Sequence, residues 1–509
     1  MTPGPSSLND PMPEWLRQRA LLSPHRLATS FGTQRWTFAE LDRRVDAVSR
    51  WLAAAGLRPG DRLALLAKNG ADFVQVAHAV PRLRAVLVPL NVRLTAGELA
   101  WQVQDCGAAF LAYDPPNAAK AAELAEMLPP LRALSVSEVA ERPHRPSKSM
   151  NPGLDWVDLS ALHTIIYTSG TMGRPKGAML TFGNHFSSAV GSALNLGLHG
   201  DDRWLACLPL FHVSGLAILL RGVIYGIPVV LHEEFDPAAA NKSIDEEGVT
   251  IVSVVANMLQ RMLEARGDRP YSPTLRCVLL GGGPVPRPLL EECARRGVPV
   301  VQTYGLTETA SQVATLAPED ALRKLGSAGK PLFPMEVRIA GEDGGFIPRG
   351  ELGEIVVRGH TVTPGYFNRS EETERALRDG WLHTGDIGYL DNEGFLYVLD
   401  RRDDLIISGG ENVYPAEVEE ALRSHPDVLD AGATGLPDER WGQVVVATIS
   451  LRKGATVGQE ELLQFCRERL ASYKVPKRLR FAETLPRNAA GKLLRHALRE
   501  EWLRETSPS

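Results

Sequence analysis

The chain has 509 residues, of which 44% are hydrophobic and 23% are charged, and its formal net charge at pH 7 is -5. A chain of this length exceeds what one hydrophobic core usually fills, so we expect two or more domains. The composition excludes a disordered chain, a collagen-like chain and a small disulfide scaffold. The net negative charge disfavours nucleic acid or an anionic membrane surface as a partner. Only 11 of the 56 basic residues are lysines, so a lysine within a motif is unusually informative.

The N-terminal segment MTPGPSSLND lacks a positive stretch followed by an apolar one, so we expect a disordered leader over residues 1–12 and no signal peptide. The five cysteines never form a C-x-x-C pair. Their scatter favours neither disulfides nor a zinc site and fits a reducing cytoplasm. The most apolar segment, residues 205–231, is broken by His212, Arg221, glycines and prolines, which predicts no membrane insertion.

From residue 36 to residue 231, and again from residue 250 to residue 304, short apolar runs bounded by Gly and Pro alternate with segments of helical periodicity. This pattern is typical of stacked α/β units. The expected strands cover residues 62–67, 162–168, 203–208, 228–231, 251–255 and 275–280. The expected helices include residues 38–55, 181–196 and 288–296. A segment rich in Pro and polar residues, 141–153, is predicted to link two N-terminal lobes.

The charged cluster DRRDD at residues 400–404 ends a run of strand-like segments and marks a further boundary. Beyond it we expect helices over residues 415–423, 459–471 and 493–503 and strands over 428–434 and 444–451. A segment of this length with its own apolar pattern is enough for a small α+β domain. The predicted fold is therefore α/β, with an N-terminal domain of stacked lobes (13–402), sheets flanked by helices, and a C-terminal α+β domain (403–509).

The segment TSGTMGRPKG, residues 168–177, directly follows the expected strand 162–168. Its glycines let backbone N–H groups approach an anion, its hydroxyls are donors, and Lys176 adds a positive charge. It is not a Walker A loop, since Pro175 and Gly177 stand where that loop needs Gly and Ser or Thr. The segment predicts a polyphosphate site, the alternative being an ordinary Gly-Ser turn.

YTSGTMGRPKG (167–177) resembles the phosphate loop of the adenylate-forming superfamily, which contains acyl-CoA synthetases, adenylation domains and firefly-type luciferases. Met172 departs from the small polar residue usual in these loops and is assigned no role. The resemblance implies that the loop binds ATP and that Lys176 is also catalytic. The residues it assigns to the nucleotide here are Thr168, Ser169, Gly170, Thr171, Gly173 and Lys176.

Three further segments resemble superfamily motifs in the same order along the chain. LPLFHVSGL (208–216) resembles the aromatic-histidine motif, which places Phe211 and a catalytic His212 at the mouth of the acyl pocket. GGGPVP (281–286) resembles the adenine-contacting turn. QTYGLTET (302–309) resembles the core motif, in which Tyr304 would stack on adenine, Thr307 would bond a phosphate and Glu308 would bind Mg²⁺. The nucleotide contacts implied by the last two segments are Gly281, Gly282, Gly283, Gln302, Thr303, Tyr304 and Thr307.

Taken alone, these residues have simpler interpretations. His212 would be a hydrogen-bonded core histidine, and Glu308 would be a solvent-facing carboxylate. The order of the motifs along the chain favours the functional interpretation.

The longest match, residues 383–419, assigns Asp386 to the ribose hydroxyls, Arg401 to ribose and phosphate, and Asp403 to a hinge between the large domain and a mobile small domain. LPRNAAGKLLR (485–495) resembles the C-terminal lysine motif, in which the catalytic Lys492 reaches the carboxylate and the α-phosphate. The family's usual Thr in this motif is replaced by Arg487 and Asn488. Without these flanking matches, residues 400–404 would be interpreted as a solvated charge cluster.

The resemblance implies an ATP- and Mg²⁺-dependent enzyme that converts an acid to acyl-AMP, releases pyrophosphate and transfers the acyl group to CoA. In the second step, SGGEN (408–412) would replace the Lys492 loop at the site. Among the expected CoA contacts, Trp441 and Tyr473 offer stacking faces and Lys477 offers a partner for a phosphate. The alternative is that these three residues are surface aromatics and a basic residue at a strand edge. These expected contacts are Gly409, Gly410, Trp441, Tyr473 and Lys477.

Whole segments, including residues 388–419, resemble the o-succinylbenzoate-CoA ligases of menaquinone biosynthesis. Their acid carries a second carboxylate on its ring, which needs a cation or several donors in the pocket. If residues 213–225 form a helix, Ser214 and Arg221 share a face with the end at His212. Arg221 interrupts an apolar run, which suits a buried anion, the alternative being an arginine that reaches the surface. Arg261 is a second candidate.

Other functions stay open at this stage. The chain could be a CoA ligase for another acid, such as a halobenzoate or a medium-chain fatty acid. It could also be a luciferase-like oxygenase. A non-catalytic AMP sensor is disfavoured because Glu308 and Lys492 are both retained. We expect small-molecule partners, and the sequence leaves a homodimer open.

Overall fold

The computed structural model describes residues 11–140, 156–168, 175–282, 285–321, 323–341, 343–401, 404, 406–408, 411–438, 441–470, 472, 474–487 and 493–506. The predicted linker, residues 141–153, lies outside these ranges. Within them, the predicted α/β architecture is confirmed, with sheets flanked by helices and a separate C-terminal sheet.

The first lobe is built on a sheet with the strand order β10-β9-β5-β4-β6-β7 in the described part of the chain. Its core strands are parallel, and the apolar side chains of β4 and β5 are buried, because helices cover such sheets on their faces. The strands are β4 (Arg62–Leu66), β5 (Val86–Pro89), β6 (Phe110–Tyr113), β7 (Arg132–Ser135), β9 (Leu162–Thr168) and β10 (Lys176–Thr181). The helices are α3 (Ala71–Arg82), α4 (Ala96–Cys106), α5 (Ala118–Met127) and the short α6 (Ser137–Ala140).

The second lobe holds the longest sheet in the described ranges, with the order β17-β16-β15-β14-β13-β11-β12-β2-β3. Parallel strands form its centre, and antiparallel strands close both of its edges. The strands are β2 (Leu27–Phe31), β3 (Gln34–Thr37), β11 (Trp204–Ala206), β12 (Val229–Leu231), β13 (Ile251–Val254), β14 (Cys277–Leu280), β15 (Val300–Tyr304), β16 (Ala314–Thr315) and β17 (Lys330–Pro331). The helices are α1 (Trp15–Leu22), α2 (Phe38–Ala54), α7 (Phe182–Leu196), α8 (Val213–Tyr225), α9 (Pro237–Glu246), α10 (Ala256–Arg266) and α11 (Arg287–Arg295).

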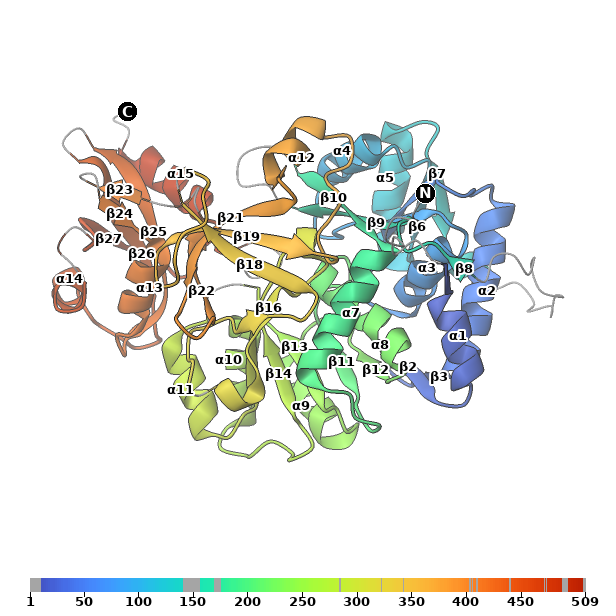
Figure 1. Cartoon of the computed structure of the whole chain (residues 1–509), viewed down its shortest axis with the longest axis horizontal. Coiled ribbons are helices and arrows are strands. Elements are labelled where there is room, and N and C mark those ends of the chain that lie inside the picture. The colour runs from blue at the N-terminus through green and yellow to red at the C-terminus, as the bar shows by residue number, and fades with distance from the viewer. Residues whose placement is uncertain are drawn as a thin grey trace, which may run out of the picture.

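Two smaller sheets follow along the chain. The first contains β18 (Met335–Ala340), β19 (Gly353–Gly359), β20 (Leu377–Arg378), β21 (Trp381–Leu390) and β22 (Leu396–Arg401), with α12 (Ser370–Ala376) beside it. The second, C-terminal sheet contains β23 (Ile406–Ser408), β24 (Glu411–Val413), β25 (Val428–Asp438), β26 (Gly442–Leu451) and β27 (Arg478–Phe481), with α13 (Pro415–Arg423), α14 (Gln459–Arg467) and α15 (Arg495–Thr506). Figure 1 shows this sheet and its helices, in orange and red, at the opposite end of the molecule from α1 and α2, in blue.

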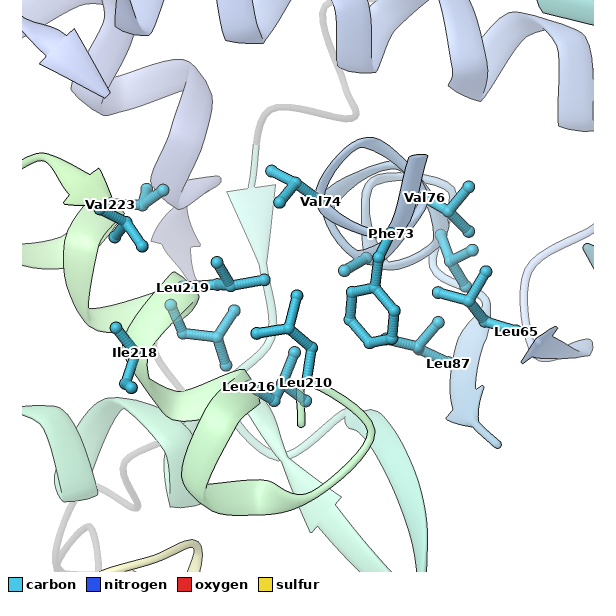
Figure 2. Close-up of a cluster of buried hydrophobic side chains, with 14 of the residues drawn as sticks. Leu65, Phe73, Val74, Val76, Leu87, Leu210, Leu216, Ile218, Leu219 and Val223 are labelled. Atoms are coloured by element: carbon cyan, nitrogen blue, oxygen red, sulfur yellow. The ribbon is translucent and has the colours of Figure 1, made fainter. Parts of the chain in front are cut away.

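The largest apolar core joins the two N-terminal lobes. Figure 2 shows Leu216 and Leu219 of α8 beside Leu210, with Phe73 and Val74 of α3 facing them from the first lobe. Each of these residues is at most 3% exposed. This core therefore fixes the position of α8, which carries the predicted site residues Ser214 and Arg221 and is preceded by His212.

Most predicted elements are present, and the differences are local. Met12, predicted to end a disordered leader, pairs with Val157 in the two-stranded sheet of β1 (Met12–Pro13) and β8 (Trp156–Val157), because a distant segment supplies its backbone partner. Residues 1–10 lie outside the described ranges. The helix expected over 459–471 ends at Arg467, and the one expected over 493–503 covers Arg495–Thr506. In the part of the chain that the structure describes, no helix is long and apolar enough to cross a membrane.

Candidate active site

A cavity of about 860 Å³ lies at the carboxyl ends of parallel strands in both N-terminal lobes. Residues at or just beyond the ends of β9, β11, β13, β14 and β15 line it, among them Thr168, Pro209, Val255, Gly281 and Tyr304. Crevices at this edge of α/β sheets are the usual location of ligand sites. Segments of the C-terminal sheet close the opposite side.

The predicted phosphate loop connects β9 and β10 at this edge. Thr168 and Lys176 pair across the antiparallel ladder and both line the cavity, so they flank the loop at its two ends. A side chain at Gly177 would approach Ile165 to 2.7 Å, which explains the glycine that follows Lys176. Four predicted nucleotide ligands, Ser169, Gly170, Thr171 and Gly173, lie outside the described residues.

Glu308, the predicted Mg²⁺ ligand, lies in the short 3-10 helix Thr307–Thr309 and lines the cavity with Thr307. The hydroxyl of Tyr366 donates a hydrogen bond to its Oε1 at 2.9 Å, and the ring of Tyr366 lies 5.3 Å from the Nζ of Lys176. One tyrosine thus contacts both the predicted metal ligand and the predicted phosphate ligand. No group of three or more His, Cys, Asp or Glu residues in the described ranges could hold a metal by itself. A single carboxylate fits Mg²⁺, which takes its other ligands from phosphate oxygens and water.

Of the predicted adenine and ribose contacts, Tyr304 and Asp386 line the same cavity. Tyr304, at the end of β15, donates a hydrogen bond from its hydroxyl to Oδ2 of the buried Asp386 at 2.6 Å. Asp386 lies opposite Arg401 in the ladder of β21 and β22. The two residues that the family resemblance assigns to the ribose are therefore on neighbouring strands, beside the residue assigned to adenine.

The turn after β14 packs closely on β15. A side chain at Gly281 would come within 2.8 Å of Thr303, and Gly282 has a φ of +84°, so both positions favour glycine. Gln302 and Thr303 also line the cavity, although the Thr303 hydroxyl donates to the carbonyl of Ala314. Gly283 lies outside the described residues.

His212 precedes α8, and its ring lies against that of Phe211 with 4.6 Å between centroids. Burial, with a smaller contribution from Arg93, lowers the pKa of His212 to about 4, so the imidazole is neutral at pH 7. Its Nε2 has no hydrogen-bond partner among the described residues, which does not fit a hydrogen-bonded core histidine. His212 and the exposed Ser214 both line the cavity.

Arg221 also lines the cavity, although its residue is only 2% exposed, so the alternative of an arginine that reaches the surface is wrong. Its Nη2 donates to the hydroxyl of Ser188 at 3.1 Å, and its guanidinium carbon lies 5.7 Å from the ring of Trp204. Its Nε has no partner, and no carboxylate forms an ion pair with it within the described ranges. Arg261, the second candidate, is exposed and lies over Phe235 outside the cavity, so its selection was wrong.

The C-terminal residues are only partly placed. Lys492, Asp403, Gly409, Gly410 and Tyr473 lie outside the described residues, but Leu493 and Leu494, which follow Lys492, line the cavity. The other two predicted CoA contacts, Trp441 and Lys477, are exposed and do not line it.

Sequence reasoning did not identify Tyr366 or the cavity pair His383 and Glu354. Nδ1 of His383 lies 3.0 Å from Oε2 of Glu354, whose other oxygen accepts a hydrogen bond from the backbone N–H of Gly385. Glu354 therefore holds the turn that precedes Asp386. The only local signal was the position of His383 at the start of the HTGD segment.

The fold and the site define an adenylate-forming enzyme. The model of the AMP-binding enzyme family matches residues 16–367, and that of the AMP-binding enzyme C-terminal domain matches residues 417–492. The chain belongs to the AMP-binding enzyme family.

Two relatives indicate the branch of this family. The chain is 56% identical to a 2-succinylbenzoate--CoA ligase of Geobacillus kaustophilus, over 96% of this chain and 97% of the relative. The o-succinylbenzoate CoA synthetase (MenE) of Bacillus subtilis has been solved with the acyl-adenylate intermediate OSB-AMP, at 47% identity, 96% and 98% coverage and a TM-score of 0.90. Its complex with ATP and magnesium has 46% identity, 96% and 100% coverage and a TM-score of 0.89. A double mutant of it with the product analogue OSB-NCoA has 47% identity, 96% and 99% coverage and a TM-score of 0.74.

Proposed function

We propose that the chain is an ATP-dependent acid-thiol ligase that joins 2-succinylbenzoate (o-succinylbenzoate) to CoA, a step of menaquinone biosynthesis. The observation that carries this substrate choice is Arg221, a buried cation in the cavity wall that forms no ion pair with a carboxylate of the described residues. Burying an unpaired charge is costly, so the pocket is suited to an acid that brings a second carboxylate. The identity to 2-succinylbenzoate--CoA ligases over nearly the whole chain supports the same acid.

In the first half-reaction, an oxygen of the succinyl carboxylate attacks the α-phosphorus of ATP, and pyrophosphate leaves. Because two anions meet, cations must neutralise the charge that develops. Lys176 and Lys492 would supply charge at the phosphates, and Asp386 and Tyr304 would hold the ribose and adenine. Mg²⁺ held by Glu308 would neutralise charge on the phosphate oxygens when bound. The neutral His212 would contact the acid without competing with Arg221 for the ring carboxylate.

In the second half-reaction, the thiol sulfur of CoA attacks the acyl carbonyl and AMP leaves. We assign Gly409, Gly410, Trp441, Tyr473 and Lys477 to this step, with Asp403 as the hinge that brings them to the cavity. We infer that the described arrangement corresponds to the first half-reaction. Supporting this, Leu493 and Leu494 line the cavity, while Trp441 and Lys477 do not. At equal identity and nearly equal coverage, the TM-score to the Bacillus subtilis enzyme is also higher for the complex with OSB-AMP, 0.90, than for the double mutant with OSB-NCoA, 0.74.

Two further proposals concern the setting of the enzyme. We expect it in the cytoplasm, since all five cysteines are free thiols and buried. The homodimer that the sequence left open stays a prediction. The molar mass of the purified chain in solution, measured by light scattering, tests it.

The acid is tested by pyrophosphate release with 2-succinylbenzoate, benzoate, 4-chlorobenzoate and octanoate, each with and without CoA. We expect the kcat/KM for 2-succinylbenzoate to be at least roughly 100-fold above that for the other acids. Each of the other acids has a single carboxylate, so it cannot both pair with Arg221 and present a carboxylate to ATP. Omission of CoA should stop turnover after one equivalent of pyrophosphate. A preference for benzoate, 4-chlorobenzoate or octanoate would overturn the proposed substrate.

A further inference from the structure

A buried serine outside the cavity lining contacts Arg221, and no motif of the family resemblance assigned it a role. Ser188 lies on α7, is 2% exposed, and accepts a hydrogen bond from Nη2 of Arg221 at 3.1 Å. Its own hydroxyl proton is donated to the carbonyl of Ala310 at 2.6 Å. Ser188 therefore has its donor and its acceptor engaged at the same time, and its direction toward Arg221 is fixed.

Ser188 holds Arg221 without neutralising its charge. A carboxylate partner would hold Arg221 equally well but would neutralise it, whereas a hydroxyl and the Trp204 ring at 5.7 Å hold it and leave its charge available. Burial, with a smaller contribution from the charge of Arg221, lowers the pKa of His185, one turn before Ser188 on α7, to about 3.

The hydrogen bond that Ser188 donates connects it to the segment that carries Glu308, the predicted Mg²⁺ ligand. Ala310 is fully buried, has a φ of +52°, and directly follows the 3-10 helix Thr307–Thr309 that carries Glu308. The carbonyl of Ala310 is thus held by the same hydroxyl that holds Arg221. A shift of Ser188 would disturb either the acid pocket or the turn beside Glu308, and the two effects can be separated by kinetics.

We propose that Ser188 is a positioning residue for acid specificity: it orients the uncompensated guanidinium of Arg221 toward the ring carboxylate of the acid. This inference rests on the proposed function. It predicts that Ser188 strengthens the recognition of a dicarboxylic acid and contributes nothing to ATP binding or to the activation of a monocarboxylic acid.

The test compares 2-succinylbenzoate with 4-oxo-4-phenylbutanoate, the same acid without the ring carboxylate. For Ser188→Ala we expect about a tenfold loss of kcat/KM with 2-succinylbenzoate, mostly through KM, because a hydrogen bond to a charged group is lost. The values for 4-oxo-4-phenylbutanoate and the KM for ATP should stay unchanged. In an Arg221→Met background, the loss from Ser188→Ala should disappear, since the two residues act as one unit.

Ser192 provides the matched control. It lies one turn further along α7, is 1% exposed, and its hydroxyl lies beside that of Tyr225 and not against Arg221. Ser192→Ala should behave as the wild-type chain, and thermal unfolding should show all variants folded. An equal loss with both acids, or a raised KM for ATP, would overturn the inference in favour of a structural role through Ala310. If Arg221→Met no longer discriminates between the two acids but Ser188→Ala still does, the inference on Ser188 fails while the proposed function stands. Equal use of both acids by the wild-type chain would overturn the proposed acid as well.

Discussion

At the scale of single residues, Tyr366 connects the two charged groups that are predicted to meet the phosphates. Its hydroxyl holds Glu308 and its ring faces Lys176. It belongs to no family motif that the sequence revealed, yet it donates a hydrogen bond to the carboxylate of Glu308. Partners of this kind orient a metal ligand and tune its affinity without touching the metal.

Tyr366→Phe removes the hydroxyl and keeps the ring beside Lys176. We expect the Mg²⁺ concentration for half-maximal pyrophosphate release to rise roughly tenfold, because Glu308 loses the group that orients it. The KM for the acid should not change, since Arg221 and His212 are untouched. An unchanged Mg²⁺ requirement, or an equal rise in the KM for the acid, would contradict this role. Tyr366→Leu, which also removes the ring contact, should be more severe.

At the scale of elements, α7 and β9 enclose a pair of buried histidines. His185 of α7 shares a hydrogen bond with Thr164 of β9 at 3.0 Å, and its ring lies 4.8 Å from that of His163. Burial, and to a smaller extent Arg221, lowers the pKa of His185 to about 3, and burial holds the pKa of His163 well below its ordinary value. Both imidazoles are therefore neutral in the folded chain.

This pair predicts how stability depends on pH. In the unfolded chain the two histidines recover an ordinary pKa near 6.5, so below that pH the unfolded state binds more protons than the folded state. Stability is present above pH 6.5 and is lost as the pH falls, by about 2 kcal/mol for His185 between pH 6.5 and 5, and the lowered pKa of His163 adds a loss in the same direction. Denaturant unfolding of His185→Asn should show a shallower loss from pH 7 to 5 than the wild-type chain. Parallel curves would refute this assignment.

The same elements show what the sequence could predict. β9 (Leu162–Thr168) and α13 (Pro415–Arg423) have the expected bounds, because an apolar run and a helix-starting proline are local signals. The strand expected over 428–434 continues to Asp438, since its hairpin partner β26 extends the pairing as far as Gly442. Pairing of this kind depends on a second segment, which a local pattern does not contain.

The site divides in the same way. Lys176, Glu308 and Asp386 belong to contiguous motifs, and the structure places all three on one cavity. The orientation of Arg221 could not be decided from the sequence, because it depends on Ser188, 33 positions away on α7. Tyr366 was missed for the same reason, since its contacts to Lys176 and Glu308 exist only after three segments have come together.

At the scale of the whole molecule, the C-terminal sheet is joined to the cavity by α15. Arg495, at the start of this helix, donates to Asp404 at 3.0 Å and to both oxygens of the buried Glu419 of α13 at 2.9 Å. Arg495 follows Lys492 by three positions, and Asp404 follows the predicted hinge residue Asp403. Because of this ion-pair network, we expect a rotation at the predicted hinge to carry α15 and α13 together as one body.

Lys492→Ala tests whether the two half-reactions use different arrangements of this body. If Lys492 serves only the attack on ATP, the variant should lose acyl-AMP formation by at least roughly 1000-fold, because a transition-state cation is removed. It should still convert chemically prepared 2-succinylbenzoyl-AMP and CoA to the thioester at close to the wild-type rate. The measurement is pyrophosphate release for the first half-reaction and thioester absorbance for the second. An Arg487→Ala variant, altered in the same motif but outside the lysine itself, should retain most of both activities. Equal loss of both half-reactions in Lys492→Ala would mean that one arrangement serves both steps, and the hinge at Asp403 would then have no catalytic role.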